Sequence, residues 1–204
     1  MGFPRLDILP LAQRRLWDDL SEVPHQFTLY GGTALALHLG HRESVDFNFF
    51  SREPLVPMQL QQRLNLAKNA EVLQAEPNTL TLQVLRGGPV KVSFFGALDL
   101  GQIEPPLNAE PPGLRIAALA DIAATKFKVI TQRAEAKDYI DIHALLQHGI
   151  LPEQMTAWAA VVFGAAFNPY PSVKAMTYFD DGDLAALPES TKQALRAAAR
   201  RFGL

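Results

Sequence analysis

YGGTALALHLGHRESVDFNFFS, residues 30–51, is the stretch of this 204-residue chain that decides its fold. The residues just before it predict a short strand, and the pair Gly31-Gly32 ends that strand. Thr33 is the expected N-cap of a short helix, because its hydroxyl can accept a backbone N–H. Gly40 then stops the helix. The pattern predicts a strand, a glycine turn and a helix in direct succession.

A second strand is predicted over residues 45–51. Successive side chains of a strand point to opposite faces of the sheet. The two faces here are Asp46, Asn48 and Phe50 on one side and Val45, Phe47 and Phe49 on the other. If this strand lies beside the glycine turn, its polar face is close to the start of the helix.

The junction of strand, glycine pair and helix has the geometry of a phosphate site. Backbone N–H groups at a helix N-terminus attract anions, and Gly31 and Gly32 allow close approach of the backbone. A carboxylate at Asp46 would hold Mg²⁺ against the same phosphates, and Arg42 would add a bidentate contact. On the glycine pair alone, an ordinary tight turn is the simpler interpretation.

The remaining pattern predicts a small sheet with helices, followed by a helical region. The predicted strands are 26–30, 45–51, 71–75, 79–85 and 89–95. The predicted helices are 10–23, 34–39, 57–70, 117–132, 136–147, 152–164 and 189–202. Residues 104–113 contain Pro105, Pro106, Pro111 and Pro112, which indicate a rigid connector. We therefore expect an α/β core over residues 1–112 and a helical domain over residues 113–204.

Composition is that of an ordinary folded protein, with 48% hydrophobic and 20% charged residues. The formal net charge of −2 gives no global basic field that would recruit nucleic acid. The absence of cysteine excludes disulfides, thiolate metal sites and cysteine nucleophiles. Because we find neither a signal peptide nor an apolar run of membrane-spanning length, we expect a cytoplasmic protein that binds no membrane.

A second group of charged residues lies in two of the predicted helices. Asp138 and Asp141 are three residues apart, so they neighbour each other on one helix surface. Two ionised carboxylates at the edge of a core repel, so we expect one raised pKa or a cation site, with Lys137 as the neutralising charge. The alternatives are a solvated helix face or a helix cap by Asp138. Lys126 lies in an apolar stretch, where its alternative is a lysine at the edge of the core.

These two groups together resemble the AbiEii/AbiGii family of nucleotidyltransferase-like toxins, found in type IV toxin–antitoxin systems. The resemblance covers about residues 27–148, and it implies a nucleotidyltransferase-type α/β fold with a small mixed sheet. The nucleotide-binding residues that it implies are Gly31, Gly32, Thr33, Arg42, Ser44 and Lys126. The catalytic residues that it implies are Asp46, Lys126 and Asp138, with Asp141 as the alternative to Asp138. The metal ligands that it implies are Asp46 and Asn48.

The resemblance also implies a substrate, a cofactor and partners. An active enzyme of this family would take an NTP with Mg²⁺ in a cleft between the two domains, and would transfer NMP to a tRNA or protein acceptor. It would act as a toxin, with a cognate antitoxin protein as its partner.

The chain departs from the family at two positions where a carboxylate is expected, which here are Asn48 and Ser93. A neutral ligand holds a hard divalent cation more weakly. Removing one preorganised electrostatic group costs about 10² to 10³ in rate. Two alternatives therefore stay open. One is a nucleotide-binding or protein-interaction module with impaired catalysis and weak or absent Mg²⁺ binding, and the other is a structural partner of an antitoxin with no nucleotide site.

The last predicted helix carries a basic stripe, made of Lys192, Arg196, Arg200 and Arg201. A solvated helix face is the simpler interpretation of such a stripe. A contact with RNA phosphates is the alternative, and a stripe this short would bind RNA weakly and with steep salt dependence.

Overall fold

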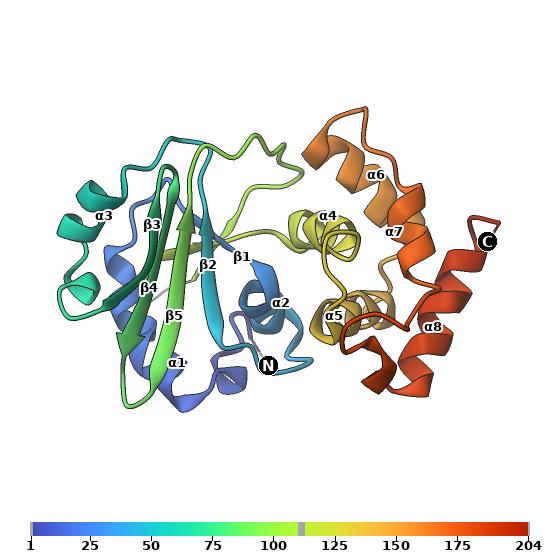
Figure 1. The fold of residues 1–204 in the computed structure, drawn as a ribbon, viewed down its shortest axis with the longest axis horizontal. Coiled ribbons are helices and arrows are strands. Elements are labelled where there is room, and N and C mark those ends of the chain that lie inside the picture. Colours follow the sequence, from blue (N-terminus) through green and yellow to red (C-terminus); the bar gives the residue numbers. More distant parts are fainter. Residues whose placement is uncertain (1, 110–112, 204) are drawn as a thin grey trace. The chain divides into compact units, whose positions relative to one another are not determined.

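The computed structural model describes residues 2–109 and 113–203 of the chain. They form two compact units. The first unit comprises residues up to 100 together with 105–118, and the second comprises 101–104 together with the residues from 119 onward. The first unit contains the sheet and the second is helical (Figure 1). The predicted α/β class, with a mixed sheet followed by helices, is confirmed.

Within the described residues, the first unit carries a seven-stranded mixed sheet in the order β3-β4-β5-β2-β1-β7-β6. Its strands are β1 (Thr28–Tyr30), β2 (Asp46–Phe50), β3 (Glu71–Glu76), β4 (Thr79–Leu85), β5 (Pro89–Phe95), β6 (Leu107–Ala109) and β7 (Leu114–Ile116). β2 pairs in parallel with β5, β1 pairs in parallel with β7, and the other neighbouring pairs are antiparallel. β2 therefore lies in the middle of the sheet.

The alternation predicted for β2 is confirmed along the strand itself. Phe47 and Phe49 are fully buried, whereas Asp46 and Asn48 on the opposite face are partly exposed. Val45 precedes the strand and is exposed, so its predicted place on the apolar face is wrong. β2 thus covers an apolar core with one face and presents polar side chains on the other.

The first and third helices of the first unit are shorter than the sequence predicts, whereas the second begins three residues earlier. They are α1 (Leu11–Leu16), α2 (Gly31–Leu39) and α3 (Pro57–Arg63), with the 3-10 turns η1 (Leu6–Ile8), η2 (Trp17–Glu22) and η3 (Asn65–Ala67). The first predicted helix tightens into η2, and the third ends where Leu64 is extended. The Glu22 carboxylate accepts the N–H groups of Asn65 and Leu66, which favours this break because the first N–H groups of η3 gain a partner.

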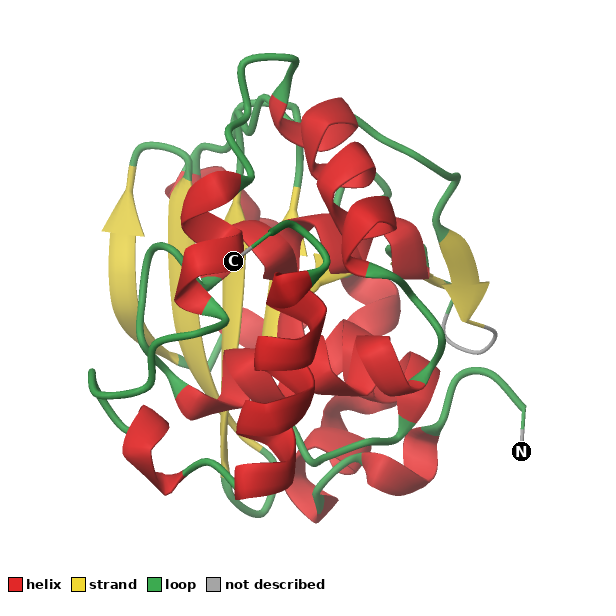
Figure 2. Cartoon of the chain, turned by 90° about the vertical axis from the view of Figure 1, so that its right-hand side faces the viewer, coloured by secondary structure: helices red, strands yellow, loops and turns green. Residues whose placement is uncertain are grey.

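The second unit is made of helices, drawn in red in Figure 2. They are α4 (Leu119–Val129), α5 (Ala136–Gln147), α6 (Pro152–Phe163), α7 (Tyr170–Ala175) and α8 (Glu189–Arg200), with the 3-10 turn η4 (Leu184–Ala186). The four helices predicted here are confirmed. α7 was not predicted. Pro169 is its N-cap and Pro171 lies in its first turn, where proline is tolerated.

Part of the predicted connector over residues 104–113 is a strand in the structure. β6 pairs with β7, and β7 pairs in parallel with β1, so this segment extends the sheet. The predicted boundary at 112 and 113, with Pro111 and Pro112, falls on or beside residues 110–112, which lie outside the described residues. Over the described part of the chain, the helices are too short or too polar to cross a membrane.

Candidate functional site

The glycine turn, Gly31 and Gly32, begins α2 directly after β1. Each of these two positions favours glycine for a different structural reason. Gly31 has φ +79°, a left-handed conformation that disfavours other residues. A Cβ on Gly32 would lie 2.6 Å from a terminal nitrogen of Arg42 and 3.0 Å from Ser44 Oγ. The Arg42 guanidinium therefore lies against the first turn of α2. Helix N–H groups and a guanidinium at one place form an anion-binding arrangement.

Thr33 lies inside the first turn of α2, and Tyr30 is the N-cap, so the predicted N-cap role of Thr33 is wrong. The Thr33 hydroxyl instead donates to the carbonyl of Asp46 at 2.5 Å and lies 2.9 Å from Ser44 Oγ. Gly31 takes the helix start because its left-handed φ lets the chain turn there without a capping side chain. The hydroxyl of Thr33 thereby fixes α2 against β2.

Asp46 forms an ion pair with Lys91 of β5, with 3.2 Å between Asp46 Oδ2 and Lys91 Nζ. The two residues face each other in the parallel register of β2 and β5. Two residues further along, Asn48 faces Ser93, and Ser93 is buried with its hydroxyl 3.2 Å from that of Thr81. The predicted neighbourhood of Asp46, Asn48 and the Ser93 position is therefore present, with an added lysine.

This donor set does not fit the Mg²⁺ site that the family implies. One carboxylate is present, and a lysine ammonium already neutralises it. Asn48 offers a neutral amide, and the Ser93 hydroxyl is buried. No cluster of three or more His, Asp or Glu side chains that could hold a metal occurs among the described residues. A hard divalent cation prefers several carboxylate oxygens, so we assign it no role here.

A second charged cluster lies in the second unit and is almost fully buried. Lys126 of α4 lies 2.7 Å from Asp138 Oδ1 and 2.5 Å from Asp141 Oδ2, both on α5. The Arg133 guanidinium lies 2.7 Å from the other oxygen of Asp138. The side chains of both aspartates are 0% exposed and that of Lys126 is 6% exposed. The alternatives of a solvated face and a core-edge lysine are therefore wrong, because all three side chains are paired inside the unit.

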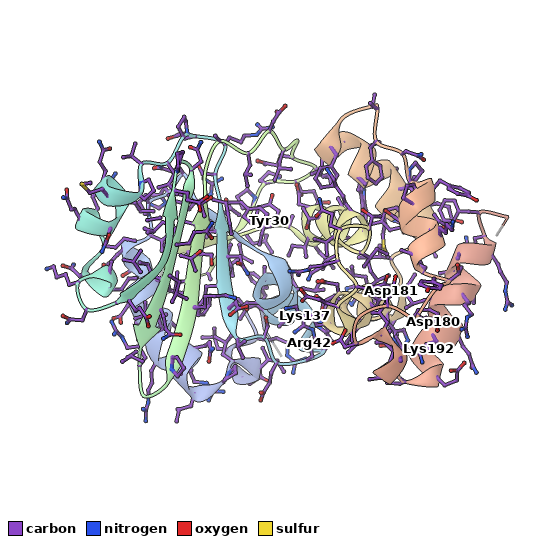
Figure 3. All side chains as sticks on the ribbon, viewed as in Figure 1. Tyr30, Arg42, Lys137, Asp180, Asp181 and Lys192 are labelled. Carbon is purple, nitrogen blue, oxygen red and sulfur yellow. The ribbon has the colours of Figure 1, made fainter. Side chains whose placement is uncertain are left out.

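Asp138 has a lowered pKa, so it is not a carboxyl of the pair with the expected raised pKa. Burial acts to raise the pKa, but the hydrogen bond from Arg133 and the charge and hydrogen bond of Lys126 outweigh it. The predicted neutralising residue, Lys137, instead pairs with Glu135 at 2.6 Å on the surface. Figure 3 labels Lys137. Asp138 is thus an ionised carboxylate at neutral pH and a weak base.

Residues 178–183 and the last helix, α8, make contacts within the second unit. Asp183 accepts the N–H of Ala136, at the start of α5. In the basic stripe, Lys192 donates to the carbonyl of Ala185, Arg196 lies 4.9 Å from the Phe179 ring centroid, and Arg201 pairs with Glu153 at 2.7 Å. Asp180, Asp181 and Lys192 are labelled in Figure 3. These contacts give the stripe a role in packing.

Lys91 and Arg133 were missed by the sequence reasoning. A signal for Lys91 exists, since it lies two residues before Ser93 as Asp46 lies two residues before Asn48. Parallel pairing in register brings such residues together. Arg133 lies in the connection between two predicted helices, where no periodicity marks it.

Comparison with protein families gives one match over most of the chain. The model of the family described as nucleotidyl transferase AbiEii toxin, type IV TA system, matches residues 15–202. That range includes both the glycine turn and the buried cluster.

Among curated proteins, an uncharacterised protein of Aquifex aeolicus is 34% identical over 128 residues. The match covers 61% of this chain, and this chain spans 60% of the length of that relative.

Two solved structures have a similar fold. MenT4, a nucleotidyltransferase toxin of Mycobacterium tuberculosis, gives a TM-score of 0.63 at 16% identity, with 95% of this chain and 81% of that chain covered. A candidate nucleotidyltransferase of H. pylori gives a TM-score of 0.55 at 18% identity, with 94% and 91% covered. At these identities the likeness concerns the fold.

Proposed function

Since this chain belongs to the AbiEii family of nucleotidyltransferase toxins of type IV toxin–antitoxin systems, we propose that it binds an NTP and transfers NMP to an RNA or protein acceptor. The toxin would have a cognate antitoxin protein as its partner. Because NTPs are cytoplasmic substrates, the proposal includes the cytoplasm as the place of action.

One observation supports NTP binding more than any other. The residues Gly31, Gly32, Thr33, Arg42 and Ser44 pack on one another at the start of α2, next to Asp46 of β2. Backbone N–H groups at the first turn of a helix attract anions, and the Arg42 guanidinium adds a positive charge. Triphosphate oxygens match both kinds of donor.

The proposed reaction is an in-line displacement at the α-phosphorus. The acceptor hydroxyl oxygen bonds to the α-phosphorus, the bond from that phosphorus to the bridging oxygen of the β-phosphate breaks, and pyrophosphate leaves with that electron pair. The hydroxyl proton passes to solvent or to a base. The residues at the start of α2 would hold the phosphates and stabilise the charge that develops on them.

Transfer of label from NTPs labelled at the α-phosphate tests this proposal, with tRNA and total cell protein as acceptors. We expect label on one acceptor class, and a loss of about 10² to 10³ in rate in Asp46→Ala. Asp99→Ala is the matched control, because Asp99 is exposed in the same unit. No transfer from any NTP would contradict the proposal.

A second candidate function is NTP binding without efficient transfer. The Asp46–Lys91 ion pair, Asn48 and Ser93 favour it, because they leave few charged ligands for catalysis. NTP at a concentration of 100 Kd would then stabilise the folded state by about 2.7 kcal/mol and raise the melting temperature, without turnover. If Asn48→Asp creates transfer where the wild type has none, this second function is supported. If no NTP changes the melting temperature, that result favours the alternative of a structural partner of an antitoxin.

The roles of Lys126 at the phosphates and of Asp138 or Asp141 at the acceptor stay predictions. Their mutual ion pairs support a structural role inside the second unit, because all three charges are already compensated there. Variants of these residues that retain the fold but lose transfer would support the catalytic assignment.

A further inference from the structure

Lys91 contacts Asp46, which is one of the two metal ligands that the family resemblance implies. It comes from β5, its ammonium lies 3.2 Å from Asp46 Oδ2, and the next pair on the same face, Asn48 and Ser93, carries no charge. A lone carboxylate neutralised by a lysine gives a divalent cation little attraction. An ammonium, in contrast, can donate to a carboxylate and to a phosphate at the same time, since it has three donors.

The pair lies on the same side of the sheet as the glycine turn. Asn48 shares a face of β2 with Asp46, and a Cβ on Gly31 would lie 3.3 Å from Asn48 Nδ2. The first turn of α2 is also bonded to Asp46 through the Thr33 hydroxyl. The side chain of Lys91 is 46% exposed, so a phosphate can reach its ammonium.

We propose that Lys91 takes the place of the divalent cation, so that its ammonium links the Asp46 carboxylate to the NTP phosphates and NTP binds without Mg²⁺. The inference rests on the proposed NTP binding, but it does not require transfer. It departs from the metal site that the family implies, on the ground of the donor set.

Calorimetric titration of the full chain with ATP, GTP, CTP and UTP, in excess EDTA and in excess MgCl₂, tests the inference. The best-bound NTP should have Kd values in the two conditions that agree within about threefold. Binding at least about tenfold tighter with Mg²⁺ overturns this inference but leaves the proposed function intact. No NTP binding in either condition overturns both.

Variants separate a lysine site from a metal site. Lys91→Met should weaken NTP binding in EDTA about tenfold or more, and Lys91→Arg should retain most of it. Asp46→Asn should change NTP binding to the same extent in EDTA and in MgCl₂, because in this inference Asp46 holds the Lys91 ammonium and not a metal ion. An unchanged Kd in Lys91→Met, or an effect of Asp46→Asn that is confined to MgCl₂, overturns the inference. Lys68→Met is the matched control at an exposed position of the same unit.

A separate observation concerns the other end of the same face. Tyr30 and Phe50 are stacked, with ring centroids 4.9 Å apart and an interplanar angle of 14°, and Phe95 meets Phe50 edge-on at 5.7 Å. All three side chains are partly exposed. Phe50 shares the face of β2 that carries Asp46, so the face has a charged end and an aromatic end. Tyr30 is labelled in Figure 3.

We also infer that this aromatic row is the stacking surface for the base of the NTP. Phe50 lies four positions after Asp46, which is about 13 Å along a strand and similar to the span of an extended nucleoside triphosphate. Aromatic rings accept any base by stacking.

Titration with ATP and with inorganic tripolyphosphate tests the aromatic inference. Phe50→Leu should weaken ATP binding about tenfold and leave tripolyphosphate binding unchanged, whereas Phe50→Trp should restore ATP binding. Lys91→Met, in contrast, should weaken both ligands. An unchanged ATP Kd in Phe50→Leu, or an equal loss for both ligands, overturns the inference.

Discussion

Lys126 is a buried cation between two buried carboxylates, and the balance of these charges governs the stability of the second unit. The Lys126 ammonium contacts Asp138 and Asp141 at 2.7 and 2.5 Å, and Arg133 covers Asp138 from the solvent side. Removing one partner of such a pair leaves an uncompensated buried charge. The cluster therefore acts as an ionic connection between α4 and α5.

Lys126→Met should destabilise the protein by about 3 to 5 kcal/mol. Two buried carboxylates would remain, and the partly exposed Arg133 would be the cation left to pair with one of them. Thermal and urea unfolding measure this, with a melting temperature lower by about 10 °C. Lys137→Met is the control, since its pair with Glu135 is largely exposed and should contribute about 0 to 1 kcal/mol. Equal effects of the two substitutions would contradict the importance given to burial.

Acid should weaken the same cluster through Asp138. The pKa of this carboxyl is lowered in the folded state, so the unfolded state binds the proton more readily. The stability it confers is fully present above the ordinary value of 3.8 and is lost as pH falls below that value towards the lowered pKa. Urea unfolding between about pH 2.5 and 6 should show this slope, and Asp138→Asn should reduce it. If Asp138→Asn leaves the slope unchanged, the pH dependence of stability comes from other carboxylates.

At the scale of elements, the start of α2 depends on two glycines that should respond differently to alanine. Gly31→Ala forces a Cβ into a left-handed conformation and against Asn48, so it should destabilise the protein by about 1 to 2 kcal/mol. Gly32→Ala adds helix propensity, worth about 0.5 to 1 kcal/mol, but its Cβ displaces the Arg42 guanidinium.

We therefore expect Gly32→Ala to keep the melting temperature of the wild type and to bind NTP more weakly. Gly31→Ala should instead have a lower melting temperature than the wild type. Calorimetry and thermal unfolding on both variants measure the two effects. If Gly32→Ala binds NTP as the wild type does, Arg42 has no part in phosphate binding.

Elements with a clear side-chain pattern or turn signal could be predicted from the sequence, and the strands β6 and β7 could not. The alternation in β2 and the helical spacing of α4 and α5 depend on local side-chain patterns, which the sequence displays directly. β6 and β7 have three residues each, too few for a pattern, and β7 gains its place by pairing with β1. The start of α2 at Gly31 depends on a backbone angle that a glycine permits but does not require.

At the scale of the whole molecule, the sequence predicted the residues that lie together in the first unit, but it predicted neither the pairing of Lys126 with Asp138 nor the way in which these charges are compensated. The glycine turn, Arg42, Ser44 and Asp46 come together in the first unit, and Lys126 joins Asp138 in the second. Lys91 and Arg133 complete the two charge balances, and Lys91 comes from β5 whereas Arg133 comes from the connection between α4 and α5. Spacing along the chain points to Lys91 only once β2 and β5 are known to pair in parallel, and it does not point to Arg133.

The family and the local chemistry bear on different parts of the function. Membership of the AbiEii family concerns the fold and the class of reaction. Asn48, Ser93 and Lys91 concern the way in which this chain would meet a triphosphate. The account as a whole depends on the glycine turn as the phosphate site.

A crystal structure of the full chain with a non-hydrolysable NTP, grown without divalent cations, tests that claim most directly. We predict density for the triphosphate at the start of α2, within hydrogen-bond distance of the N–H groups of Gly32 and Thr33, of Arg42 and of Lys91. Well-defined nucleotide density elsewhere, with the glycine turn lacking phosphate, would contradict the account.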